Sequence, residues 1–363
     1  MRRNTACRFR LGARLVVAAL ATVFLCSPGS RAQAQAGTGA AIGGTPPLTS
    51  GAVPVALVRF PLSRYRIGVT LAGNRVGANA PLLDIAHVAA AECAINGTFF
   101  AAYPGETGEP YGTLVVNGKL LHVGRIGTRL DILADGRIRM VRDRLEIRGS
   151  LDGSEAYPYN WYAYNINQTP SPGGSSVYVL TPERGPTLGF RAELAVVARR
   201  GSVIRIARDE DAVIPRDGFV VAMQRKEVEI LGWKFRLGQR IGYRAVQDGE
   251  TFASRFSLGA GPRLVEHGAV SVNPIAEGFR DPKIVAWRGT RSVVGVTARN
   301  EVILAVIARA TVVEAAATIQ QLGAVEAMNL DDNASSGLVC NGKYLVRPGR
   351  QVANALVLWP GPR

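Results

Sequence analysis

Three dipeptides that favour two-residue hairpin turns constrain the fold of this chain more than any other feature. Each separates two short β-prone runs, and they are Asn117-Gly118, Asp135-Gly136 and Asn341-Gly342. Because Asn, Asp and Gly tolerate the positive φ angles that such turns require, the flanking runs are predicted to pair as antiparallel strands. Three further hairpin turns are predicted, at Arg200-Gly201, His267-Gly268 and Arg299-Asn300.

Two stretches have the apolar spacing of helices, residues 82–91 and residues 311–322. The second stops at Gly323, a residue that commonly ends helices. Each stretch leads through a short apolar run to an asparagine, Asn96 or Asn329, and then to a polar turn. We therefore predict an α+β fold, a single domain rich in mixed or antiparallel sheet, with two main helices feeding the turns of an active site.

The first 36 residues are typical of a cleaved signal peptide. Five Arg precede the apolar run 15–25, which is too short to span a bilayer, and Ala-Gln-Ala at 34–36 offers small residues for cleavage. An uncleaved membrane anchor is the alternative. We expect residues 37–52 to be a flexible lead-in and residues 53–363 to form the domain. The mature protein would then be secreted or periplasmic, without stable insertion in a membrane.

The chain is strongly basic, with a formal net charge of +15 over 363 residues. The first 36 residues hold six Arg and no acidic residue, which leaves about +9 on the remainder. Such a charge favours anionic partners, and because the cations are scattered and no nucleic-acid module is visible, anionic glycans are favoured over nucleic acid. A generally basic proteome is the alternative.

Several chemistries are excluded by missing motifs. The sequence contains no HExxH, no CxxC, no G-x-S-x-G and no P-loop, so we expect no metal and no cofactor. Once the signal is removed, Cys93 and Cys340 are the only cysteines. In an oxidising compartment they are candidates for a disulfide, and two buried free thiols are the alternative.

Four segments then occur in an order that resembles the phosphodiester glycosidase family. They are AINGTFF (94–100), GAGPRLVEHGAV (259–270), TRSVVGVT (290–297) and LGAVEAMNLDDNASSGL (322–338). The segments NINQTPSPGGSSVYVLTPERG (165–185) and IPRDGFVV (214–221) and the tail 341–358 extend the likeness. The resemblance implies an extracytoplasmic domain that hydrolyses a sugar phosphodiester, or a related glycosidic bond, at the anomeric carbon. The expected substrate is an anionic carbohydrate or sugar phosphate that belongs to an envelope or extracellular polymer.

The resemblance also indicates site residues, and their chemistry fits. Asp331 follows a buried run and is the expected catalytic carboxylate, because an oxocarbenium-like transition state needs one. Arg291 is expected to hold the phosphate through its planar guanidinium, and Asn96 completes the predicted catalytic set. The predicted substrate-binding residues are Thr98, Arg263, Arg280, Asn165, Gln168, Asn329, Ser335 and Ser336. Both cysteines lie within ten residues of these motifs, which favours a disulfide between them.

One turn departs from the family pattern. Where the family usually has LDGG, this chain has Leu330-Asp331-Asp332-Asn333, so two glycines are replaced. Asp and Asn are the residues that best tolerate positive φ, but their side chains occupy space that glycine leaves for a ligand. A non-catalytic descendant that binds anionic glycans is therefore the alternative function. The second catalytic carboxyl stays open among Glu106, Glu109 and Asp281.

Overall fold

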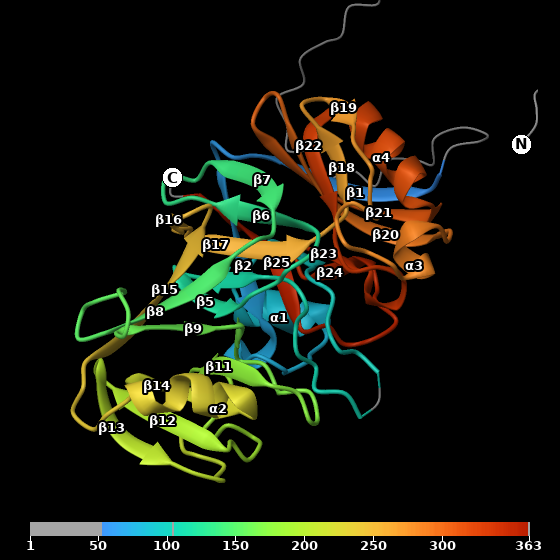
Figure 1. The fold of residues 1–363 in the computed structure, drawn as a ribbon. Coiled ribbons are helices and arrows are strands. Elements are labelled where there is room, and N and C mark those ends of the chain that lie inside the picture. The colour runs from blue at the N-terminus through green and yellow to red at the C-terminus, as the bar shows by residue number, and fades with distance from the viewer. Residues whose placement is uncertain (1–52, 104, 362–363) are drawn as a thin grey trace, which may run out of the picture. The chain divides into compact units, whose positions relative to one another are not determined.

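The structure is a computed structural model that describes residues 53–103 and 105–361 (Figure 1). The predicted signal peptide and lead-in lie outside the described residues. The described part is sheet-rich, and its strands form five sheets in which β10 and β11 are the one parallel pair. The largely antiparallel architecture agrees with the sequence prediction.

Two of the five sheets carry the turns of the site. The six-stranded sheet has the order β1 (Val55–Pro61), β21 (Glu301–Ala310), β20 (Gly289–Thr297), β22 (Ala324–Asn329), β18 (Arg263–Glu266), β19 (Ala269–Val270). A five-stranded sheet has the order β2 (Tyr65–Leu71), β25 (Asn354–Pro360), β3 (Cys93–Asn96), β23 (Leu338–Cys340), β24 (Lys343–Val346).

The remaining three sheets are built from the middle of the chain and from β17. One has the order β5 (Lys119–His122), β4 (Leu114–Val116), β17 (Phe256–Ala260), β6 (Thr128–Ile132), β7 (Ile138–Arg142). Another has the order β10 (Asn165–Ile166), β11 (Ser176–Leu180), β14 (Gly218–Gln224), β12 (Leu194–Arg199), β13 (Ser202–Ala207). The last has the order β16 (Glu250–Thr251), β15 (Ile241–Gln247), β8 (Glu146–Leu151), β9 (Asn160–Ala163).

All six predicted hairpin turns join neighbouring antiparallel strands. They connect β4 to β5, β6 to β7, β12 to β13, β18 to β19, β20 to β21 and β23 to β24. Asn117 and Gly118 adopt φ angles of 51° and 79°, and Asn341 and Gly342 adopt 50° and 69°. The dipeptides thus supply the left-handed backbone that a tight hairpin requires.

Two helices lie within the predicted stretches, α1 (Leu82–Val88) and α4 (Val312–Gln321). Thr311 begins α4 with a capping box, in which its side chain accepts from the Glu314 N–H and the Glu314 carboxylate accepts from the Thr311 N–H. The structure adds two short helices that the sequence did not predict, α2 (Lys226–Leu231) and α3 (Pro282–Val285), and the 3-10 turns η1 (Ala72–Asn74), η2 (Gly232–Lys234) and η3 (Asn333–Ser335). No helix in the described ranges is long and apolar enough to cross a membrane.

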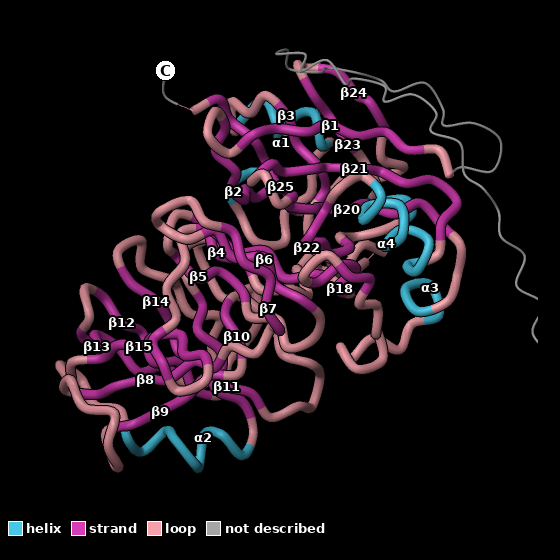
Figure 2. Tube along the Cα trace, turned by 90° about the horizontal axis from the view of Figure 1, so that it is seen from above, coloured by secondary structure: helices cyan, strands magenta, loops and turns pink. Residues whose placement is uncertain are grey.

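Each of the two longer helices packs on the sheet that contains the strand following it. The buried stripe of α4 consists of Val312, Ala315, Ala316 and Ile319, which pack with residues of β20, β21 and β22. In the same way α1 packs against β3, β23 and β25. Figure 2 shows α4 beside β20 and α1 beside β3. This packing fixes the strands β3 and β22, whose ends carry the site.

Cys93 and Cys340 form a disulfide in the structure. They are register partners on the antiparallel strands β3 and β23, with a Cα–Cα distance of 4.1 Å. Both side chains are buried. The bond links the strand that leads to Asn96 with the strand that follows the Asp331 turn.

Candidate active site

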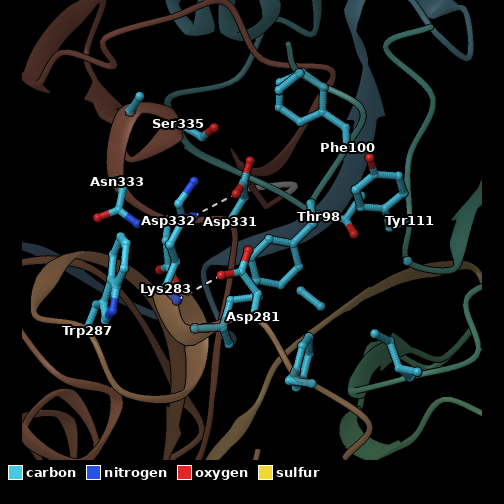
Figure 3. Close-up of a pocket in the computed structure, with 18 of the residues that line it drawn as sticks. Thr98, Phe100, Tyr111, Asp281, Lys283, Trp287, Asp331, Asp332, Asn333 and Ser335 are labelled. Atoms are coloured by element: carbon cyan, nitrogen blue, oxygen red, sulfur yellow. Dashed lines mark hydrogen bonds between the residues drawn. The ribbon is translucent and has the colours of Figure 1, made fainter. Parts of the chain in front are cut away.

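A cavity of about 520 Å³ lies over the turns that follow β3 and β22. Its wall carries three carboxylates, Asp281, Asp331 and Asp332, and four cations, Arg280, Lys283, Arg288 and Arg350. Aromatic rings complete it, and they are Phe99, Phe100, Tyr103, Tyr111, Phe279 and Trp287. Figure 3 shows Asp331 between Thr98 and Asp332, with Asp281, Lys283 and Trp287 on the opposite wall. Charged groups and flat rings around one cavity suit an anionic sugar.

The turns after β3 and β22 are joined through Asn96. Its Nδ2 donates to the Asp331 backbone oxygen at 2.7 Å, and its Oδ1 accepts from the Ser292 hydroxyl at 2.7 Å and from the Gly337 N–H at 3.0 Å. The Asp331 N–H donates in return to the Gly97 carbonyl at 2.9 Å. Asn96 is 1% exposed. It therefore holds the position of Asp331 and does not face the cavity.

Close packing beside Asn96 requires glycine at position 97. A Cβ atom on Gly97 would lie 2.0 Å from Oδ1 of Asn354, which accepts a hydrogen bond from the Thr98 N–H at 2.9 Å. The glycine thus lets Asn354 hold the backbone of the residue that follows. Thr98 then lines the cavity with a buried hydroxyl that has no hydrogen-bond partner among the described residues.

Asp331 is the carboxylate best placed for chemistry. It is half-buried on the cavity wall, and one of its oxygens accepts from the Asp332 N–H at 2.8 Å. Burial, reinforced by the negative charge of Asp332, raises the pKa of Asp331 to about 7, although a hydrogen bond from Ser335 works in the opposite direction. A carboxyl group with such a pKa can exchange a proton near neutral pH.

Asp332 is buried beside it and pairs with Arg291, whose Nη1 lies 2.5 Å from Oδ2. Its second oxygen, Oδ1, has no hydrogen-bond partner among the described residues. Burial raises the pKa of Asp332 to about 6, and Arg291 limits the rise. Asp332 replaces a glycine of the family pattern, and in the structure it is a second, buried carboxylate beside Asp331.

The second replaced glycine is accommodated by a conformation that asparagine tolerates. Asn333 has a φ of 56°, in the left-handed region, whereas Asp332 has a φ of −112° that any residue adopts. The Asn333 amide packs against Gly289, where an added Cβ would lie 2.1 Å from its Oδ1. The turn therefore keeps a glycine-like backbone at one position, and the cavity beside it stays open.

Arg291 does not line the cavity, so the expectation of direct phosphate contact needs correction. Its side chain is fully buried at the start of β20. Besides Asp332, it donates to the backbone oxygens of Ala310 at 3.1 Å, Lys283 at 3.0 Å and Trp287. Because the guanidinium is saturated by these acceptors, we assign Arg291 as a positioning residue behind Asp332.

Besides the predicted Arg280, the cavity wall carries three cations that the sequence did not indicate, Lys283, Arg288 and Arg350. Lys283 donates to the Tyr103 hydroxyl at 3.0 Å, and the Arg350 guanidinium lies 5.7 Å from the centre of the same ring. Neither Lys283 nor Arg350 forms a salt bridge within the described part of the chain. Arg288 pairs with Glu314 at 2.6 Å, so its charge is already neutralised. Sequence reasoning missed Lys283 and Arg350, although Arg350 lies in the tail segment that resembles the family.

Of the other predicted substrate-binding residues, Arg280 and Ser335 line the cavity. Asn329 is fully buried behind it, and the Ser336 hydroxyl donates to the Thr290 carbonyl at 3.1 Å. Arg263 is buried in β18, where it pairs with Glu326 and donates to the backbone oxygens of Val265 and Met140. Asn329, Ser336 and Arg263 are therefore placed as structural supports.

Asn165 and Gln168 are likewise outside the cavity wall. The Asn165 side chain exchanges two hydrogen bonds with the backbone of Val123, each at 2.9 Å, and so ties β10 to the segment after β5. Both the oxygen and the nitrogen of the Asn165 amide are therefore used in hydrogen bonds within the protein. The family-like segment 165–185 is thus a structural element in this chain.

The three carboxyl candidates named from the sequence lie in different surroundings. Glu109 is held by Arg184 at 2.8 Å and by Thr169, and Glu106 accepts from the Tyr103 N–H at 2.9 Å. Asp281 lines the cavity and caps α3 by accepting from the Lys283 N–H at 2.9 Å. No group of three or more His, Cys, Asp or Glu in the described ranges is arranged to hold a metal ion.

Comparison with known proteins adds family and fold. The family model for phosphodiester glycosidases matches residues 193–359, which include Lys283, Arg291, Asp331, Asp332 and Arg350. A hypothetical protein from Synechocystis has a TM-score of 0.72 at 22% identity, covering 85% of this chain and 59% of that one. A Burkholderia pseudomallei protein, named as a predicted exported protein, has a TM-score of 0.65 at 21% identity, covering 84% and 74%. At these identities the likeness shows the fold alone.

A third solved structure is the catalytic domain of zebrafish N-acetylglucosamine-1-phosphodiester alpha-N-acetylglucosaminidase. The match covers 87% of this chain and 86% of the zebrafish chain, at 13% identity and a TM-score of 0.45. No curated protein matches the sequence. This chain spans somewhat more than half the length of the Synechocystis protein. The family model matches the C-terminal part of this chain.

Proposed function

Since residues 193–359 belong to the phosphodiester glycosidase family, we propose that this protein hydrolyses glycosyl phosphodiesters in the cavity that Asp331 lines. Water attacks the anomeric carbon, the bond from that carbon to the phosphate oxygen breaks, and the electron pair leaves with the phosphomonoester. The sugar is released with a free anomeric hydroxyl. The observation that carries this proposal is a half-buried carboxylate of raised pKa on the wall of a cationic, aromatic cavity.

Asp331 acts as the general base in this scheme. It takes a proton from the attacking water, and a pKa of about 7 suits proton transfer at neutral pH better than it suits a nucleophile that must stay ionised. A phosphodiester is a good leaving group, so protonation of the departing oxygen contributes little. The half-buried position gives the carboxylate access to water while limiting its solvation.

Lys283 and Arg350 bind the phosphate. Both are held at Tyr103 on the cavity wall, and neither is neutralised by a carboxylate of the described residues. A guanidinium and an ammonium stabilise the negative charge that develops on the leaving phosphate. Trp287 and Tyr111 are both exposed and both line the cavity, so their rings offer flat surfaces for the apolar face of a sugar ring.

The N-terminal pattern supports action outside the cytoplasm, on an anionic glycan of the envelope or the surroundings of the cell. The competing function, a binding protein without turnover, is favoured by the two side chains that replace glycine. The open cavity and the exposed face of Asp331 favour the enzyme. One experiment separates the two.

The test uses purified mature protein with a panel of hexose-1-phosphate esters and matched glycosides in water enriched in ¹⁸O. Phosphorus NMR should show a phosphomonoester product without ¹⁸O in the phosphate, because water attacks carbon. The Asp331→Asn variant should be inactive, and the Asp135→Asn variant, changed at an exposed hairpin tip, should retain activity. Label in the phosphate would contradict attack at carbon. Ligand binding without any product would favour the binding protein.

A further inference from the structure

Residues 226–237, which form α2, η2 and the turn after them, bury two charged side chains together with the apolar Leu231 and Phe235. Glu227 is buried, and its two oxygens accept from the hydroxyls of Tyr162 at 2.6 Å and Tyr164 at 2.8 Å. Lys234 is also buried, and its ammonium donates to Asn160, to the backbone oxygen at 2.7 Å and to Oδ1 at 2.9 Å. Two charged side chains thus face inward with their hydrogen bonds satisfied.

Leu231 and Phe235 of the same segment are buried in the core, but three other large apolar side chains face outward. Ile230, Trp233 and Leu237 are 45%, 58% and 68% exposed. The ring of Tyr157, 76% exposed, lies 6.4 Å from the Trp233 ring. The Lys234 ammonium lies 5.2 Å and 5.6 Å from the centres of these two rings and holds them in place from below. We call the four exposed side chains, Tyr157, Ile230, Trp233 and Leu237, the α2 patch.

Folding does not account for this arrangement. Burial of apolar side chains stabilises a fold, whereas contiguous exposed apolar groups mark contact surfaces. The segment buries Leu231 and Phe235 in the core, yet it leaves Ile230, Trp233 and Leu237 exposed to water. In Figure 2, α2 runs along the outer edge of the trace, where nothing else is drawn against its outer side.

The residues around the patch say what kind of surface fits it. Exposed cations on the segment and beside it are Arg225, Lys226, Arg236 and Arg240. The exposed carboxylates there are fewer, Glu229 and Asp152, and Asp152 accepts from the Arg240 N–H at 3.1 Å. Of these cations, Arg225 is paired with Glu193 at 3.6 Å, and the other three have no salt bridge among residues 53–103 and 105–361. The patch is therefore apolar at its centre and positive around it.

We propose that the α2 patch docks the protein on the surface of an anionic lipid bilayer. Trp and Tyr favour the interface between headgroups and acyl chains, aliphatic side chains insert below it, and surrounding Lys and Arg contact anionic headgroups. A polysaccharide fits less well, because the two rings meet at 64° and do not form one flat platform, and Ile230 and Leu237 have no flat face. This contact is peripheral and does not depend on the proposed chemistry.

The test is co-sedimentation of the mature protein with vesicles of phosphatidylglycerol and phosphatidylcholine, and with phosphatidylcholine vesicles alone. We expect binding to the anionic vesicles that weakens at least tenfold in 0.5 M salt. The triple variant Ile230→Ser, Trp233→Ser, Leu237→Ser should lose at least tenfold in affinity. The matched control Val88→Ser, Leu345→Ser changes exposed apolar residues elsewhere and should bind like the parent protein.

A conservative variant keeps the test informative if the triple variant folds poorly. Trp233→Phe should keep the fold, and the blue shift of tryptophan fluorescence on adding anionic vesicles should shrink in it. Equal binding by the triple variant and the control would overturn the proposal, as would the absence of binding to anionic vesicles. A third outcome is that the parent protein does not bind vesicles but self-associates or binds a polysaccharide, and that the triple variant loses this interaction. Such a result would assign the patch to a second copy or to the polysaccharide and would also overturn the proposal.

Discussion

Two buried arginine–aspartate clusters in this molecule have similar composition and different surroundings. In the first, Arg129 on β6 is fully buried and pairs with Asp131 at 2.6 Å and Asp143 at 3.1 Å. Every oxygen of the two carboxylates is paired, since Asp131 also accepts from Ser257 and Asp143 from Thr113. This cluster is closed, because no hydrogen-bonding position is left for a ligand.

The second cluster, at the cavity, is open. Arg291 is equally buried, but Oδ1 of its partner Asp332 has no hydrogen bond, and the neighbouring Asp331 reaches the cavity wall. Burial raises the pKa of Asp143 in the closed cluster as it does for Asp331 and Asp332 in the open one. A raised pKa therefore does not by itself mark an active site. What distinguishes the two clusters is unused hydrogen-bonding capacity beside a cavity.

The largest expected effect is loss of activity when the open cluster loses its base. Asp331→Asn should lower kcat about 10²- to 10⁴-fold, because an amide keeps the shape of the side chain but cannot accept the proton of the attacking water. Steady-state kinetics on an active phosphodiester substrate measures this. Far-UV circular dichroism should stay unchanged. Activity within tenfold of the parent would remove Asp331 from the mechanism.

The second effect concerns the closed cluster and appears in stability. Arg129→Met leaves the buried Asp143 without its cation and Asp131 with only the partly exposed Arg139, so we expect a loss of about 3–5 kcal/mol in the free energy of unfolding. Urea denaturation of the mature protein measures it. The matched control is Arg137→Met, which breaks the exposed pair with Asp135 and should lower the free energy of unfolding far less than Arg129→Met does. Equal losses in the two variants would show that the closed cluster contributes no more than a surface pair.

The contrast between the clusters also explains what the sequence predicted well. The six hairpin turns and the helices α1 and α4 follow from local rules, since a dipeptide sets a turn and an apolar spacing sets a helix face. The segment of α2 escaped prediction because two of its charged residues, Glu227 and Lys234, face inward and three of its apolar residues are exposed. Local pattern cannot indicate such an arrangement, which depends on partners in distant strands.

The site was predictable to a similar extent. A carboxylate after a buried strand identified Asp331, and the structure joins it to Asn96 through a hydrogen bond. The roles of the arginines were not predictable, because a sequence motif does not show whether a guanidinium faces a cavity or a ring of carbonyl oxygens. Arg291 and Arg263 are each held by backbone oxygens and by one carboxylate, Asp332 or Glu326, whereas Arg350, from the far end of the chain, reaches the cavity wall.

The third effect separates the cations of the cavity from those of the rest of the surface. Lys283→Gln and Arg350→Gln should each raise KM for a phosphodiester about tenfold, because each removes one charged contact to the phosphate. KM for a neutral glycoside, if one is cleaved, should change little. Arg66→Gln, an exposed arginine outside this cavity, is the control and should leave both values unchanged. Equal effects on charged and neutral substrates would contradict a phosphate site.

The smallest effect is a shift in pH dependence that probes the coupling inside the open cluster. A general base must be unprotonated to act, so kcat/KM should fall on the acid side with a midpoint near the Asp331 pKa of about 7. Near that pH Asp332, whose pKa is about 6, is mostly ionised, and its charge helps to keep the proton on Asp331. Asp332→Asn removes the charge, so the midpoint should move to lower pH, while burial keeps it above the ordinary value for aspartate.

Stability provides an independent measurement of the same coupling. A carboxyl group whose pKa is raised by folding stabilises the folded state most at low pH, and this contribution is lost as pH rises through the folded-state value. The free energy of unfolding should therefore decline between about pH 4 and pH 8, and less steeply in Asp332→Asn. An acid-side midpoint that does not move in Asp332→Asn would show that the two carboxylates of the open cluster titrate independently.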